Sequence, residues 1–88
     1  MANEIRPSKD VVSRRVGDEI VLVNLQSEEM YSLNPTGARA WELLGEGNDQ
    51  DAIEATLSDE YGIHREEARR ELEVLFEELE RSRLVERA

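Results

Sequence analysis

The chain has 88 residues, enough for one small domain spanning residues 1–88, with an ordered core expected at about residues 10–86. Its composition, 39% hydrophobic and 36% charged, is that of a globular protein, and the absence of cysteine excludes a disulfide framework and a zinc–thiolate site. The net charge is −10, and because residues 1–16 carry +2 the rest sums to −12, a surface that would repel the phosphates of a nucleic acid.

Three short extended segments are predicted in the first third of the chain. Residues 11–16 are rich in valine and end at a glycine-aspartate turn signal. Residues 20–25, Ile-Val-Leu-Val-Asn-Leu, form a nearly unbroken apolar run, typical of a central strand that is covered on both faces. A polar turn at residues 26–29 leads into a third short strand, Met30–Leu33. The short connections predict a three-stranded antiparallel meander.

The first helix is expected to begin at Asn34-Pro35. Asparagine caps a helix N-terminus well, and proline at the first helical position has no N–H to lose. This helix should span about residues 35–44 and end at the two glycines that follow. Its predicted core residues are Ala38, Trp41 and Leu44.

Two further helices follow, separated by a sharp turn. The second should begin near Asp49 or Asp51, where a carboxylate favours the helix dipole, and end at Gly62. The third should span about residues 65–83, which leaves only Ile63-His64 between the two, as in a helix-turn-helix. The predicted fold class is therefore α+β, a winged helix-turn-helix with a three-stranded antiparallel sheet followed by three helices.

The third helix has a well-defined apolar stripe. Its core residues fall within about 60° of one another at 100° per residue, and they are Ala68, Leu72, Leu75 and Leu79. Phe76 lies about 40° to one side of Leu72, with Arg69 and Glu73 further round on that flank. Val74 points away from the stripe and should be exposed.

No catalytic motif stands out. His64 is the single histidine and lies between two predicted helices, where a turn or capping role is the ordinary one. Acidic pairs such as Glu77-Glu78 are expected on solvated helix faces. The serines have no histidine partner at a recognisable spacing, and no glycine-rich loop joins a strand to a helix. We therefore expect no enzyme activity, no cofactor and no metal.

The third strand, by contrast, offers a binding edge. In a meander the third strand is an edge, and its unpaired N–H and C=O groups can accept a further strand from another chain. Tyr31 and Leu33 should face the core, while Met30 and Ser32 take the other side. The alternatives left open are a dimerisation module that uses the same edge and a DNA-binding winged helix. Against DNA binding, three glutamates lie beside Arg69 and Arg70.

The run Tyr-x-Leu-Asn-x-x-Gly-x-x-x-Trp, formed by Tyr31, Leu33, Asn34, Gly37 and Trp41, resembles the PqqD-like family. These are the recognition elements for precursors of ribosomally made, modified peptides, and the resemblance extends over about residues 10–86. It implies that a precursor's leader segment pairs antiparallel with the third strand and lies against the third helix. It also implies a less favourable start for that helix, because His64 stands where such helices often begin with Asp, Ser or Pro.

The resemblance implies a set of peptide-binding residues. The backbone ladder would come from Glu28, Glu29, Met30, Tyr31, Ser32 and Leu33. For the helix side we choose, from helix geometry, Arg69, Leu72, Glu73 and Phe76. Arg69 could pair with an acidic leader residue and Phe76 could form the floor of an apolar pocket.

The residues 24–34, Asn-Leu-Gln-Ser-Glu-Glu-Met-Tyr-Ser-Leu-Asn, resemble the stand-alone members of lasso-peptide clusters more than those of pyrroloquinoline quinone synthesis. The first kind would deliver a precursor to a leader peptidase and then a macrocyclase, and the second to a radical enzyme. We expect a monomer or weak homodimer. No apolar run approaches the roughly 18 residues of a membrane span, and the start lacks the apolar core of a signal peptide, so the cytoplasm is the expected location.

Overall fold

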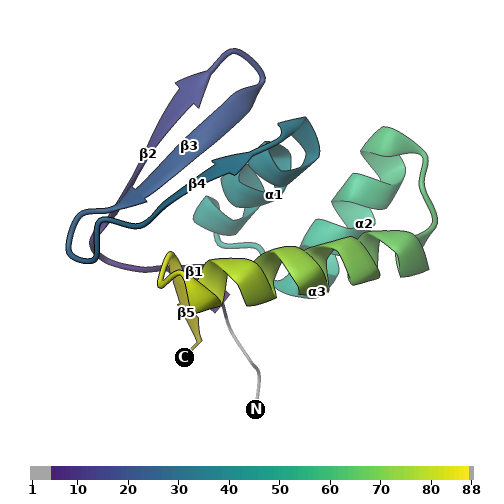
Figure 1. Cartoon of the computed structure of the whole chain (residues 1–88). Helices are drawn as coiled ribbons and strands as arrows, with labels where there is room; N and C mark the ends of the chain where they lie inside the picture. Colours follow the sequence, from purple (N-terminus) through teal and green to yellow (C-terminus); the bar gives the residue numbers. More distant parts are fainter. Residues whose placement is uncertain (1–4, 88) are drawn as a thin grey trace.

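The computed structural model describes residues 5–87 and contains two small sheets and three helices (Figure 1). Strands β2, β3 and β4 form an antiparallel meander, and α1, α2 and α3 follow it, which confirms the predicted α+β winged helix-turn-helix arrangement. The elements in chain order are β1 (Ile5–Pro7), β2 (Val11–Val16), β3 (Glu19–Asn24), β4 (Met30–Leu33), α1 (Pro35–Gly45), α2 (Gln50–Tyr61), α3 (Arg65–Arg81) and β5 (Val85–Arg87).

A second sheet joins the two ends of the described chain. Strand β1 pairs antiparallel with β5, with Ile5 opposite Arg87 and Pro7 opposite Val85. Val85 and the preceding Leu84 are buried, so the segment after α3 closes the core. The pairing itself was not predicted, since strands of three residues carry no readable alternation and their partners are nearly a whole chain apart.

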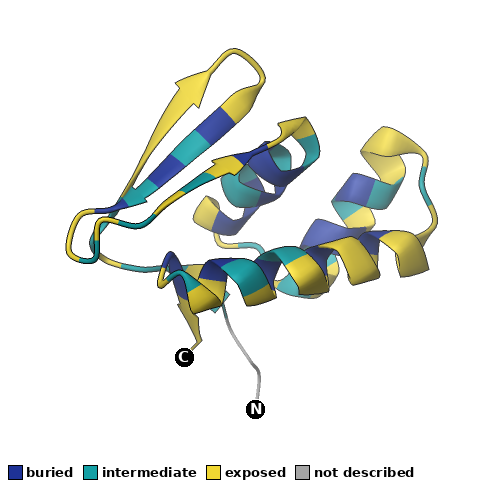
Figure 2. Cartoon of the chain, viewed as in Figure 1, coloured by how far each residue is buried: buried dark blue, intermediate teal, exposed yellow. Residues whose placement is uncertain are grey.

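The central strand is covered on one face only. Ile20, Leu22 and Asn24 are buried, whereas Val21 and Val23 between them are partly exposed (Figure 2). The expectation of two covered faces is therefore wrong. The helices pack on one side of the meander, and the apolar side chains of residues 21 and 23 lie on the open side, as β-branched residues do on a half-buried pleated surface.

The helix starts follow the predicted caps. The Asn34 side chain accepts a hydrogen bond from the Gly37 backbone N–H at 2.8 Å, and Asp49 accepts one from Ala52 at 2.9 Å. His64 holds the N-cap position of α3 without a side-chain hydrogen bond, as its poor capping chemistry predicts. Trp41, predicted to be a core residue, is only partly buried and packs at the margin of the core.

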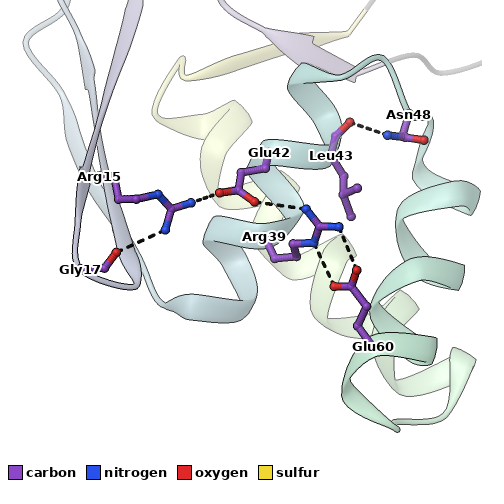
Figure 3. Close-up of polar contacts among 7 residues, drawn as sticks. All are labelled: Arg15, Gly17, Arg39, Glu42, Leu43, Asn48 and Glu60. Carbon is purple, nitrogen blue, oxygen red and sulfur yellow. Dashed lines mark hydrogen bonds and ion pairs between the residues drawn. The ribbon is translucent and has the colours of Figure 1, made fainter.

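Charged side chains connect the sheet to the first two helices (Figure 3). Arg15 of β2 pairs with Glu42 of α1, and Arg39 of α1 also contacts Glu42, at 3.2 Å. Arg39 further binds Glu60 of α2 through two hydrogen bonds of 2.9 and 2.8 Å, and these bonds lower the pKa of the Glu60 carboxyl. Because the charged groups are partly solvated, these ion pairs add little to the free energy of unfolding, and their main effect is to fix the orientation of the helices.

Asn24 holds the turn before β4 against the end of α3. Its amide group donates to the Arg83 carbonyl at 2.6 Å, and its carbonyl oxygen accepts from the backbone N–H groups of Gln26 and Ser27 at 2.8 and 3.0 Å. The residue is 6% exposed. Its side chain thereby fixes β4 relative to α3, two elements that are far apart in the sequence.

We expect Asn24→Ala to lower the free energy of unfolding by about 1.5–3 kcal/mol, because it removes three hydrogen bonds at a buried position. Urea denaturation would measure the loss. Asn48→Ala is the matched control, since that side chain makes one hydrogen bond, to the Leu43 carbonyl at 2.9 Å, and should cost about 1 kcal/mol or less. Equal losses in the two variants would contradict the role assigned to Asn24.

Candidate functional site

A groove of about 800 Å³ lies between strand β4 and helix α3. The strand and the start of α1 form one wall, and one flank of α3 forms the other. The residues that line it are Tyr31, Ser32, Leu33, Asn34, Thr36, Gly37, Ala40, Leu57, Arg70, Glu71, Leu72, Val74, Leu75 and Glu78. A groove beside an open strand edge is suited to an extended peptide, which gains backbone hydrogen bonds on one side and side-chain contacts on the other.

The hydrogen-bond register shows which backbone groups of β4 point outward. The Asn24 N–H donates to the Glu29 carbonyl at 2.9 Å, and Leu22 lies opposite Tyr31 in the same ladder. Because hydrogen-bonded pairs alternate in an antiparallel ladder, Tyr31 and Leu33 bond to β3. Met30 and Ser32 therefore present their N–H and C=O groups to the free edge. Their side chains are exposed while Leu33 is buried and Tyr31 partly buried, as predicted.

The outward ladder is shorter than the predicted segment of residues 28–33. Glu28 has φ of 66° and belongs to the turn, where its N–H donates to the Asn24 carbonyl at 2.7 Å. Glu29 directs its carbonyl to β3. Neither residue lies in the strand, so the structure reduces the backbone available for pairing to Met30 and Ser32. That a peptide pairs there remains a prediction.

Three of the four helix residues chosen from the sequence do not line the groove. Arg69 contacts the buried carboxylate of Glu54 in α2 at 3.5 Å, and Arg65 contacts the same oxygen at 3.4 Å. These two arginines compensate a charge that would be costly to bury alone, so they attach α3 to α2. The ion pair with Glu54 also occupies Arg69, which a DNA-binding helix would need for contacts with phosphates.

Phe76 and Glu73 are also placed elsewhere. Phe76 is 1% exposed and belongs to the core cluster, and Glu73 is exposed but outside the groove. Leu72 alone, of the four, lines the groove, at its buried side.

Ala68, Leu72 and Leu79 of the predicted core stripe are buried, but Leu75 is only partly buried and lines the groove. The flank chosen for peptide binding, on the Phe76 side of the stripe, was wrong. The groove is lined by the opposite flank, with Glu71, Val74 and Glu78. The sequence predicts solvent exposure for Val74 and Glu78, so it does not reveal their place in the groove.

Tyr31 and Glu78 connect the two walls. The Tyr31 hydroxyl donates a hydrogen bond to Oε1 of Glu78. This bond, together with burial and the nearby negative charge, raises the pKa of the Tyr31 phenol, which stays a donor at neutral pH. The contact between Tyr31 and Glu78 identifies the flank of α3 that borders the groove. The sequence does not reveal this contact, because the two residues are 47 positions apart.

Two other kinds of site were sought in the described part of the chain, a metal centre and a membrane-spanning helix. Within residues 5–87 no group of three or more His, Cys, Asp or Glu side chains could hold a metal ion. No helix in that part of the chain is long and apolar enough to cross a membrane.

Comparisons with known proteins agree on a family and a fold. The sequence pattern of the family described as "Coenzyme PQQ synthesis protein D (PqqD)" matches residues 19–85. A solved structure described as "TbiB1 in Complex with the TbiA(beta) Leader Peptide" is 33% identical, covers 92% of this chain and 94% of that one, and has a TM-score of 0.88. Another, "Lasso peptide synthetase B1 complexed with the leader peptide", is 24% identical, covers 93% and 96%, and has a TM-score of 0.84, a likeness of fold. No curated protein sequence matches the chain.

Proposed function

The chain belongs to the PqqD family, and from this premise we propose that it is a non-catalytic domain that binds the leader segment of a ribosomally made precursor peptide. The observation that carries the proposal is the free edge of Met30 and Ser32 beside the groove against α3. An extended leader would add to β4 as a fourth strand and place alternate side chains in the groove.

The comparisons support a leader segment as the ligand. TbiB1, which is 33% identical over nearly the whole of both chains, was solved with a leader peptide. The second structure, of a lasso peptide synthetase B1, has the same fold and was also solved with a leader peptide. We therefore favour lasso-peptide biosynthesis, with delivery of the bound precursor to a leader peptidase and then a macrocyclase. Delivery to a radical enzyme in pyrroloquinoline quinone synthesis is the alternative within the same family.

Titration with leader peptides tests the proposal. A fluorescently labelled leader from a precursor encoded beside this protein should bind with sub-micromolar to micromolar affinity, roughly −8 to −10 kcal/mol. The same titration at two salt concentrations with a DNA duplex serves as the comparison, because duplex binding weakens steeply with salt. If no neighbouring precursor's leader binds, the proposed function is wrong, and salt-sensitive duplex binding would favour the DNA-binding alternative instead.

A further inference from the structure

The Glu78 carboxylate is the charged group at one end of the groove. Its Oε1 accepts the hydrogen bond from Tyr31, whereas Oε2 has no hydrogen-bond or ion-pair partner among residues 5–87. The side chain is partly buried between strand and helix. An oriented carboxylate with one free oxygen, beside a groove, can accept a charge-assisted hydrogen bond from a ligand.

The surroundings of Glu78 favour a cation. Glu28 and Glu29 precede β4 at the same end, and the chain as a whole carries −10. Arg70, the basic residue among those that line the groove, lies two helical turns away and is adjacent to Glu71. Over residues 28–29 and 77–83 together, five glutamates stand against two arginines, Arg81 and Arg83. The charge at the Glu78 end is therefore net negative, and a positively charged side chain would be stabilised there.

The direction of an added strand gives the order of its residues. Helix α3 runs back along β4 in the opposite direction (Figure 1). Antiparallel pairing is the more stable kind, and a strand added antiparallel to β4 would run in the same direction as α3. It would pass Arg70 first, then Val74 and Leu75, and reach Glu78 last.

The spacing between the two peptide residues follows from the rise per residue of a helix and that of a strand. Four helical residues from Val74 to Glu78 cover about 6 Å, and two strand residues cover about 6.6 Å. Because side chains of a strand alternate between its faces, residues at positions i and i+2 both face the groove. An apolar side chain at i would contact Val74 and Leu75, and the side chain at i+2 would reach Glu78.

We propose that Glu78, oriented by Tyr31, is a specificity-determining residue that selects lysine or arginine in the bound peptide two positions after an apolar residue. This inference rests on the proposed function, since it concerns the same groove. Tyr31 is a positioning residue in it. Its hydroxyl remains protonated because the neighbouring carboxylate raises its pKa, so it keeps holding Oε1 and leaves Oε2 for the peptide.

Selection from a library of random 12-residue peptides displayed on phage tests the preference without a known ligand. The full chain should enrich peptides with an apolar residue, any residue, and then Lys or Arg. Glu78→Gln keeps the shape of the side chain and removes its charge, so it should enrich the apolar position alone. Glu77→Gln makes the same charge change on an exposed residue outside the groove and should leave the preference intact.

One enriched peptide and its Lys→Gln version then quantify the effect by fluorescence anisotropy. The unaltered protein should bind the lysine peptide about tenfold more tightly, the value of a partly solvated charge-assisted hydrogen bond. Glu78→Gln should bind both peptides equally. Made in the unaltered protein, Tyr31→Phe should reduce the ratio of the affinities for the lysine peptide and its Lys→Gln version. Made together with Glu78→Gln, it should leave that ratio unchanged. A purely structural role of Tyr31 would not produce this difference.

The outcomes separate the two proposals. If no peptide is enriched although the leader binds in the titration, the preference assigned to Glu78 is refuted and the proposed function stands; if the leader does not bind either, both proposals fail. If peptides are enriched and compete with the leader, but without a basic residue at i+2 or with one that Glu78→Gln still selects, the function stands and the role of Glu78 is refuted. A basic residue enriched before the apolar one would refute the antiparallel direction on which the order depends.

Discussion

Ser32→Pro is expected to weaken binding of the leader peptide by at least about tenfold while leaving the fold intact. The N–H of Ser32 points to the free edge, so its loss removes no hydrogen bond within the domain. In the complex, the same loss leaves a peptide carbonyl unpaired at a cost of about 1–3 kcal/mol, and the proline ring obstructs the approach of the added strand. Titration with the leader peptide, with circular dichroism as the check on folding, would measure it.

Ser13→Pro is the matched control on the other edge of the same sheet. The Leu25 N–H donates to the Asp10 carbonyl at 2.9 Å, so the alternation along β2 turns the N–H of Ser13 outward as well. The substitution is chemically identical and should leave leader affinity within about twofold, because β2 is not beside the groove. Equal weakening by both prolines would indicate a general disturbance of the sheet. Weakening by Ser13→Pro alone would move the site to β2.

Local chemistry made most of the fold predictable. The Asn34-Pro35 signal, the Asp49 cap and the left-handed Gly62 each act within a few residues, and each helix boundary that depends on them is as expected. The alternation at Met30–Leu33 likewise gave the faces of β4. These elements agree with the sequence because the forces that specify them are short in range.

The site was less predictable because it is defined by how distant elements meet. Which flank of α3 borders β4 depends on the path of the two helices between them, and on contacts such as that of Asn24 with Arg83. Periodicity determines angles around a helix but not the direction from which a neighbour approaches. Phe76, about 40° outside Leu72 at the edge of the stripe, could therefore be core or groove from the sequence alone.

Because Phe76 is buried, we expect its truncation to have a large effect on stability. Phe76→Ala should lower the free energy of unfolding by about 3–5 kcal/mol, since it removes a large side chain that is 1% exposed and leaves a cavity in the core cluster. A small domain has a total stability of only about 5–15 kcal/mol, so much of it would be lost. Urea denaturation should show a much lower midpoint with a similar slope.

Peptide binding by the folded fraction of Phe76→Ala should change little, because Phe76 does not line the groove. Val74→Ala should give the opposite pattern, because that side chain is 57% exposed and lines the groove. Its truncation should lower the free energy of unfolding by less than about 0.5 kcal/mol and weaken peptide binding several-fold. The two variants together separate core from groove on one helix. If Phe76→Ala instead retained its stability and lost the peptide, Phe76 would be a groove residue, as helix geometry alone had suggested, and the flank assigned from the structure would be wrong.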